Sequence, residues 1–179
     1  SFCDRDNGTA IQENNNTQNG GAESNTAISM ITPYVSQSDM SSINEAYSTS
    51  SDAPWGFEHR GIDFFPNGDL KPFRTAASGT IDNIDLIQLE STLNRQVSIR
   101  LICNETNSVN YAFEPMTSGQ TDGQAQPDHI PVSIGQQAAK GDTPGYLLAA
   151  GNGAHVDFLL FENREPVCQE TCFTSDARD

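Results

Sequence analysis

The chain has 179 residues, of which 24 are acidic and 9 are basic, giving a formal net charge of −15 at pH 7. Such an acidic surface repels phosphate groups, which excludes nucleic acid and anionic lipid surfaces as its main partners. The sequence has no apolar run long enough to span a membrane and no signal peptide, and its length suits one compact core.

Residues 1–27 are mostly Asn, Gly, Gln, Thr and Ser, with almost no apolar side chains. A segment of this composition cannot bury enough apolar surface to order itself, so we expect a polar N-terminal arm or linker. We expect residues 28–179 to form a single β domain with a cysteine-containing C-terminal tail. Within it, residues 28–53 carry enough apolar side chains for a first strand and a short helix.

From residue 54 onwards the pattern indicates β-strands. Apolar and polar residues alternate over residues 80–89 and 96–103, as they do in half-buried strands. Residues 145–150 and 156–161 are further strand candidates, whereas residues 117–127 are expected to form a polar loop. These short strands predict a mainly β fold with little helix, built as an antiparallel β sandwich or a flattened barrel.

Two segments carry histidine and aspartate at alternate positions. Side chains alternate between the faces of a strand, so His59, Gly61 and Asp63 would point the same way. His155 and Asp157 would likewise share one face. If the fold brings the two segments together, they would form a metal site, because imidazole nitrogen and carboxylate oxygen both bind zinc. The alternative for each histidine is a structural place in the core.

The residues around these positions follow a recognisable order. Residues 59–64 read His-Arg-Gly-Ile-Asp-Phe, residues 134–145 form a glycine-rich loop, and residues 153–158 read Gly-Ala-His-Val-Asp-Phe. Over about residues 54–162 this order and spacing resemble the lysostaphin-type (LytM-like) zinc metallopeptidases, which cut peptide cross-bridges in bacterial cell walls. The resemblance implies the duplicated hybrid motif type of fold, a mostly antiparallel β structure with a metal groove across one sheet.

The resemblance also implies a role for each residue. His59 and Asp63 fall on two of the family's zinc ligands. Asp157 falls on the third ligand, where the family has histidine. His155 falls on the family's catalytic histidine, which acts as a general base or stabilises the transition state. The implied set is therefore His59, Asp63 and Asp157 for the metal and His155 for catalysis.

A second departure concerns a further family histidine, which is replaced here by Phe113. A positioned histidine typically contributes about a hundred- to ten-thousandfold in general acid–base catalysis, and phenylalanine contributes none. We expect the neighbouring Glu114 to point away from the site and to be a poor substitute. His129 is the remaining histidine of the chain, and a solvated loop position is the simpler interpretation for it.

The exchange at Asp157 changes the expected metal chemistry. Two carboxylate ligands cancel the charge of a divalent ion, which weakens its action as a Lewis acid and its effect on bound water. Carboxylate oxygen also favours harder ions than zinc. We therefore expect zinc or another divalent cation, such as manganese or calcium, and impaired hydrolysis. For Asp157 itself two interpretations stay open: a ligand, or a carboxylate that replaced histidine after metal binding was lost.

The cysteines bear on location. Cys3, Cys103, Cys168 and Cys172 form an even set without the histidine or second cysteine pair of a zinc knuckle. Disulfides in an extracytoplasmic compartment are the expected use, with three possible pairings that the sequence does not rank. We expect a mature or truncated secreted, periplasmic or cell-surface protein.

Three functions remain from the sequence. The first is a divergent cell-wall-type metalloendopeptidase with impaired chemistry. The second is a non-catalytic binding or regulatory domain that uses the old peptidase groove. The third is a scaffold whose metal is structural. The expected partner is a cell-wall peptide, or a peptide segment of a partner protein.

Overall fold

The computed structural model describes residues 28–88, 95–115, 122–149 and 153–174. The expected N-terminal arm, residues 1–27, lies outside this part of the chain. Within it, the fold is mainly β and every pairing between strands is antiparallel, which confirms the predicted fold class. The helical turns there are of the 3-10 kind: η1 (Gln37–Asp39), η2 (Asp122–His129) and η3 (Glu170–Cys172).

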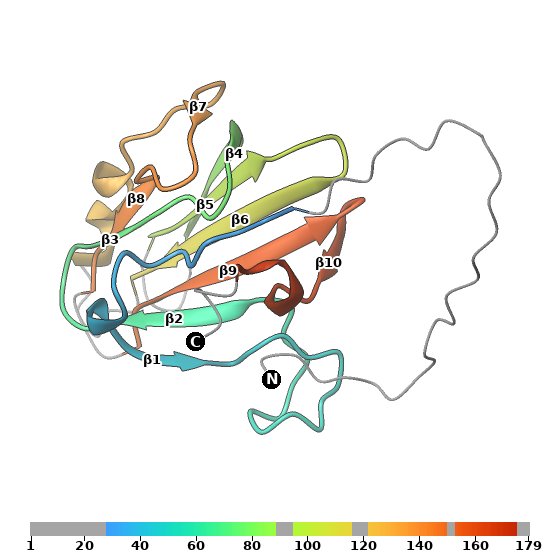
Figure 1. Cartoon of the computed structure of the whole chain (residues 1–179). Helices are drawn as coiled ribbons and strands as arrows, with labels where there is room; N and C mark the ends of the chain where they lie inside the picture. The colour runs from blue at the N-terminus through green and yellow to red at the C-terminus, as the bar shows by residue number, and fades with distance from the viewer. Residues whose placement is uncertain (1–27, 89–94, 116–121, 150–152, 175–179) are drawn as a thin grey trace, which may run out of the picture.

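One large twisted sheet forms the body of the molecule (Figure 1). Seven of its strands follow the order β1 (Met40–Asn44), β2 (Ile62–Pro66), β9 (His155–Glu162), β6 (Asn107–Glu114), β5 (Arg95–Ile102), β4 (Gly79–Gln88) and β7 (Gln137–Ala138). The eighth strand, β10 (Glu165–Val167), pairs with the last part of β9. The two segments singled out in the sequence, which lie about a hundred residues apart, thus become neighbours through β2 and β9.

A second, two-stranded sheet of β3 (Lys71–Phe73) and β8 (Gly145–Leu147) packs against one face of the large sheet. Phe73 of β3 meets Phe113 of β6 edge-on, with ring centroids 5.8 Å apart. Gly145 of β8 lies so close to the Phe113 ring that a Cβ there would come within 2.8 Å of its Cζ. The main core therefore lies between the two sheets.

Apolar side chains at alternate positions of the central strands fill this core. Six fully buried apolar residues come from β6 and β9: Val109, Tyr111, Phe113, Val156, Phe158 and Leu160. Burial of each large apolar side chain contributes about 1.5–3 kcal/mol, so this face carries much of the stability. The residues between them, among them Glu114, His155 and Asp157, point to the opposite face.

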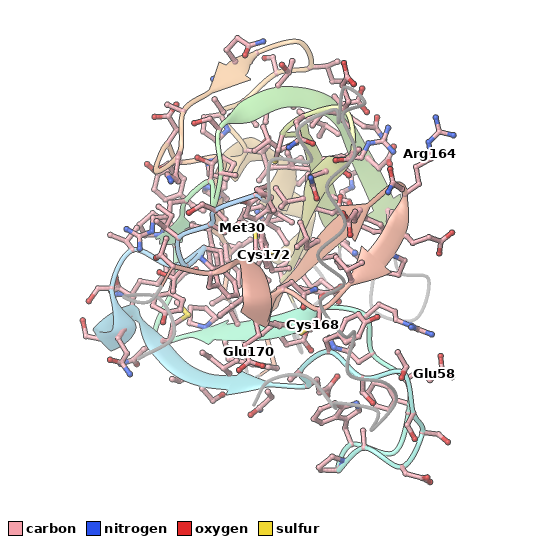
Figure 2. The ribbon with its side chains drawn as sticks, turned by 45° about the vertical axis from the view of Figure 1, so that its right-hand side comes forward. Met30, Glu58, Arg164, Cys168, Glu170 and Cys172 are labelled. Atoms are coloured by element: carbon pink, nitrogen blue, oxygen red, sulfur yellow. The ribbon has the colours of Figure 1, made fainter. Side chains whose placement is uncertain are left out.

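The ends of the described chain meet. Met30 forms a parallel bridge with Phe173, and its amide donates to the carbonyl of Cys172 at 2.8 Å. Figure 2 shows Met30 and Cys172 next to each other. The short helix expected within residues 28–53 is wrong, because this extended pairing, the 3-10 turn η1 and strand β1 take its place.

The cysteines divide into different states. Cys168 is disulfide-bonded, and its partner lies outside the described residues. Cys103 is a free thiol, and burial raises its pKa to about 11. A disulfide in the C-terminal segment is therefore present, whereas the pairings that would use Cys103 are not. Among the described residues, no helix is long and apolar enough to cross a membrane.

Candidate metal centre

Backbone pairing places the first histidine. His59 precedes β2 and forms a two-way bridge with Ser48: the Ser48 amide donates to the His59 carbonyl at 2.6 Å, and the His59 amide donates back at 3.1 Å. Asp63 follows inside β2, where it pairs with Asn44 on one side and Asp157 on the other. Residues paired across neighbouring strands share a face, so Asp63 and Asp157 lie together.

Gly61 makes this approach possible. A Cβ at this position would collide with the Asp157 carboxylate. Residue 61 therefore needs to be a glycine so that the Asp157 carboxylate can lie beside its backbone. The glycine of the His-Arg-Gly-Ile-Asp-Phe segment thus has a steric role in the site.

The four predicted site residues meet on one face of the sheet. His59 Nε2 lies 3.4 Å from Asp63 Oδ1 and 3.8 Å from Asp157 Oδ1. His155 Nε2 lies 3.7 Å from Asp63 Oδ2. Asp63 is therefore central, with one carboxylate oxygen toward each histidine. The structure brings the set together; it leaves the roles of ligand and catalyst as predictions.

Glu114 corrects one expectation. It pairs with His155 across β6 and β9, and its Oε2 lies 3.6 Å from His155 Nε2. The expectation that Glu114 points away from the site is wrong. Phe113 points away instead, into the core, where it is fully buried. The sequence held the signal: Val109, Tyr111 and Phe113 alternate as apolar core residues, which leaves Glu114 on the polar face.

Glu45 is a member of the cluster that the sequence did not reveal. It follows β1 in the left-handed backbone region, with φ 47°. Glu45, His59 and Asp63 each offer a ligand atom, and these atoms all lie within 4.8 Å of one another. No local pattern marks Glu45, because only the pairing of β1 with β2 brings it to the site. It is a second candidate for the third ligand, beside Asp157.

The cluster is electrostatically strained. Burial lowers the pKa of His59, but the nearby carboxylates of Asp63, Asp157 and Glu45 outweigh this effect and raise it to about 9. Burial and the charge of Asp63 raise the pKa of Asp157 to about 7. Burial also raises the pKa values of Glu45 and Glu114. The raised pKa values of His59 and Asp157 both favour the protonated form, which reduces the repulsion between the crowded carboxylates.

Several polar atoms of the site are buried without a hydrogen-bond partner among the described residues. They are Asp63 Oδ1, Asp157 Oδ1 and His59 Nδ1. Buried polar groups in folded proteins nearly always have a partner, and a bound ion can be that partner where the chain supplies none. A nitrogen donor with two or three carboxylates suits zinc or a harder divalent ion. The residues present therefore fit a divalent cation.

His155 is held in a defined orientation. Its Nδ1 lies 2.8 Å from the Gly153 carbonyl oxygen, which favours a proton on Nδ1 and leaves Nε2 facing the cluster. Phe65 stacks on the ring, with centroids 5.0 Å apart and planes 28° from parallel. An imidazole fixed in this way can accept or donate a proton at Nε2. His129 lies at the end of η2, whose main contacts are with β5 and β8.

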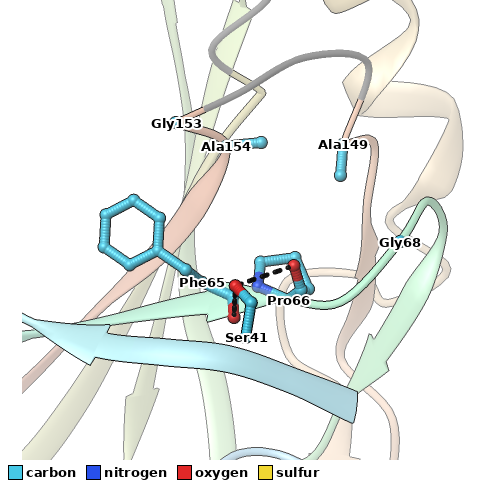
Figure 3. Close-up of a pocket in the computed structure, with 7 residues that line it drawn as sticks. All are labelled: Ser41, Phe65, Pro66, Gly68, Ala149, Gly153 and Ala154. Atoms are coloured by element: carbon cyan, nitrogen blue, oxygen red, sulfur yellow. Dashed lines mark hydrogen bonds between the residues drawn. The ribbon is translucent and has the colours of Figure 1, made fainter.

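Two pockets border the cluster. The first, of about 340 Å³, is lined by Ser41, Phe65, Pro66, Gly68, Ala149, Gly153 and Ala154. Figure 3 shows it, with the Ser41 hydroxyl donating to the carbonyl oxygens of Phe65 and Pro66. The second, of about 390 Å³, is lined by Ile43, Asn44, Glu45, Ala46, Pro54 and Trp55. We call them the Ala154 pocket and the Trp55 pocket.

Solved structures share this architecture. A zinc-containing peptidase from Vibrio cholerae matches with a TM-score of 0.54 and 17% identity, over 78% of this chain and 38% of that chain. Lysostaphin from Staphylococcus simulans matches with a TM-score of 0.50 and 17% identity, over 79% and 53%. The fold is that of the lysostaphin-type peptidases.

The same fold also occurs in a chain of the SpoIIQ–SpoIIIAH pore-forming complex, with a TM-score of 0.57 and 14% identity over 79% of this chain and 89% of that chain. No protein-family model and no curated protein sequence matches this chain. The chain spans 38% of the Vibrio cholerae peptidase, and at such identities the likeness shows the fold alone. The lysostaphin-type fold therefore carries peptidases as well as a member of a protein–protein complex.

Proposed function

We propose that this domain is a divergent metalloendopeptidase, which binds one divalent cation through His59, Asp63 and Asp157 and hydrolyses peptide bonds slowly. The observation that carries the proposal is the pair of buried oxygens, Asp63 Oδ1 and Asp157 Oδ1, which lie within ion-pair distance of His59 Nε2 but have no hydrogen bond among the described residues. Burying carboxylates without hydrogen bonds costs free energy, and a cation bound between His59, Asp63 and Asp157 would offset this cost.

The bound cation would act as a Lewis acid that polarises the peptide carbonyl and lowers the pKa of a bound water molecule. His155 would take up or release the proton at Nε2, with its tautomer set by Gly153 and its ring held by Phe65. Gly61 leaves room for the Asp157 carboxylate. Glu45 would bind the same cation as an additional ligand or replace Asp157 in that position.

The surplus of carboxylates makes the chemistry slow. Asp63 and Asp157 cancel the charge of a divalent cation, and Glu45 and Glu114 add further negative charge nearby. The effect of a metal on bound water depends on its net positive charge. Glu114 also competes with substrate for His155 Nε2. We therefore expect turnover well below that of a site with His-Asp-His ligands.

The expected substrate is a peptide of the cell wall or a segment of a partner protein, outside the cytoplasm. Support comes from the lysostaphin-type fold and from the disulfide at Cys168, since disulfides persist in oxidising compartments. The net charge of −15 opposes long-range attraction to an anionic wall polymer, so recognition would depend on short-range contacts.

The test is cleavage of pentaglycine and of a wall-derived peptide, followed by mass spectrometry with added zinc or manganese. We expect slow metal-dependent release that is lost in His59→Ala and in His155→Ala but kept in His129→Ala, the matched control outside the site. Cleavage that persists with His59→Ala would show that another centre or a contaminant is responsible.

A non-catalytic binding domain is the second candidate. It is favoured by Glu114, which lies beside His155 where it hinders proton transfer, and by the occurrence of the fold in the SpoIIQ–SpoIIIAH complex. This alternative predicts metal-dependent or metal-independent peptide binding without any product. The same cleavage assay, run beside a binding assay, separates the two.

A further inference from the structure

The two pockets lie at opposite ends of the charged cluster. β1 and β2 run antiparallel, with Asn44 opposite Asp63 and Met40 opposite Pro66. The Trp55 pocket is at the Asn44 end, and the Ala154 pocket is at the Pro66 end. Glu45 belongs both to the Trp55 pocket and to the cluster around His59, whereas Phe65 belongs to the Ala154 pocket and stacks on His155. Each pocket is therefore linked to the cluster by one residue, Glu45 at one end of the β1–β2 pair and Phe65 at the other.

The two pockets differ in chemistry. The Trp55 pocket has apolar walls from Ile43, Ala46, Pro54 and Trp55, which suit a large aliphatic side chain. The indole Nε1 of Trp55 is buried and has no hydrogen-bond partner among the described residues, so an acceptor such as a peptide carbonyl would satisfy it.

The Ala154 pocket is lined largely by small residues and by main chain. Among the described residues that line it, the larger apolar ones are Phe65, whose ring stacks on His155, and Pro66; Gly68, Ala149, Gly153 and Ala154 are small. The carbonyl oxygens of Phe65 and Pro66 already accept from Ser41. This end suits a glycine or alanine, for which close approach of the main chain is the main interaction.

The spacing sets the length of the ligand. Ser41 lines one pocket and Glu45 the other, and they lie four residues apart on the same segment. Four residues of a regular strand span about 13 Å, at about 3.3 Å per residue. The irregularity between Met40 and Ser42 and the left-handed backbone of Glu45 shorten this span, so an extended peptide of about four residues reaches from one pocket to the other. An extended chain that fills both pockets would pass beside Glu45 and Phe65, which contact the cluster around His59 and His155.

We propose that the groove selects an extended peptide with a large aliphatic residue in the Trp55 pocket and a glycine or alanine about four residues away in the Ala154 pocket. The proposal rests on the proposed function, because it takes the ligand of the site to be a peptide. It adds the class of sequence that the peptide would have, which differs from a uniform glycine chain by the large residue at one end.

Trp55 is the single tryptophan of the chain, so its fluorescence reports directly on this pocket. The probes are four blocked pentapeptides: Leu-Gly-Gly-Gly-Ala, Ala-Gly-Gly-Gly-Leu, Ala-Gly-Gly-Gly-Ala and Leu-Gly-Gly-Gly-Leu. Each is titrated with zinc and again with a chelator, while Trp55 emission is recorded and heat is measured by calorimetry. The two mixed sequences cover both directions of the peptide.

We expect one mixed peptide to bind about tenfold or more tightly than Ala-Gly-Gly-Gly-Ala, with a shift in Trp55 emission, because burial of one leucine side chain is worth at least that factor. The peptide with leucine at both ends should bind more weakly than this mixed peptide. Ala46→Leu, which fills the Trp55 pocket, should abolish the preference. Leu86→Ala, on the exposed part of β4, is the control and should keep it.

Equal affinity for all four peptides, unchanged Trp55 emission at saturation, or a preference that survives Ala46→Leu would overturn the proposal. So would a failure of every peptide to bind. These outcomes are separate from the proposed hydrolysis: a clear preference without cleavage counts against the peptidase alone, and cleavage without a preference counts against the two-pocket assignment alone.

Discussion

The two faces of strands β6 and β9 carry opposite kinds of residues on the same backbone. One face holds Phe113, Phe158 and their apolar neighbours, all fully buried and packed against the second sheet. The other face holds Glu114, His155 and Asp157: His155 lies within ion-pair distance of Glu114, and Asp157 Oδ1 has no hydrogen-bond partner among the described residues. Much of the apolar burial therefore lies on the face away from the site, so the site can change while the core persists.

The largest effect is expected when a site residue is placed on the core face. Phe113→His replaces a fully buried ring with an imidazole that has no hydrogen-bond partner there. We expect a loss of about 3 kcal/mol or more in the free energy of unfolding, measured with denaturant. Glu114→His, one residue along on the site face, should cost much less. Equal losses would contradict the assignment of faces.

The second prediction adds histidine where the geometry allows it. Asp157→His with Glu114→His restores net positive charge at the cation and places a second imidazole beside His155. We expect the double variant to cleave pentaglycine about a hundredfold faster than the unmodified chain, and each single change to gain little, because such groups act as a unit. Rates come from timed mass spectrometry with zinc. An unmodified chain that already matches the double variant would show that its chemistry is intact.

The third prediction concerns the steric fit between the strands of the site. Gly61→Ala places a methyl group where the Asp157 carboxylate now lies. We expect zinc affinity to fall about tenfold, with a stability loss of about 1–3 kcal/mol from overpacking. Titration calorimetry measures the first and denaturant unfolding the second. Gly135→Ala is a comparison with open space around the Cβ, although its positive φ of 86° adds strain of its own. If Gly61→Ala bound zinc as tightly as the unmodified chain, Asp157 would not be a ligand of the cation.

The smallest expected effect is on stability against pH in the chelated protein. The pKa of Asp157 rises from 3.8 to about 7 on folding, so the folded state holds a proton that the unfolded state has lost, and stability falls as pH rises through this window. The pKa of His59 rises from 6.5 to about 9, so its contribution is complete below 6.5 and is lost as pH rises through 9. Melting temperatures should therefore fall between pH 5 and pH 9.

Asp157→Asn is the matched variant for this series. It removes the carboxylate and should flatten the curve between pH 4 and pH 7, while the fall near pH 9 remains because Asp63 still faces His59. A melting temperature of the chelated protein that rises with pH would contradict the electrostatic description of the cluster.

The sequence predicted the sheet and the common faces of the four clustered side chains for a definite reason. Alternation is a local property, so His59, Asp63, His155 and Asp157 could be assigned to faces before any pairing was known. Glu45 could not, since its place depends on β1 pairing with β2 and on a left-handed backbone conformation. Glu114 was misplaced because the family pattern puts position 113 at the site, whereas the apolar alternation of β6 puts Phe113 in the core and its neighbour Glu114 at the site.

Elemental analysis decides whether one divalent cation binds at His59 and Asp63. The protein is dialysed against zinc or manganese, freed of loosely bound ions, and measured beside His59→Ala and the control His129→Ala. We predict one ion per chain in the unmodified protein and in His129→Ala, and none in His59→Ala. A metal-free unmodified protein, or a full ion in His59→Ala, would contradict the assignment of this cluster as a metal centre.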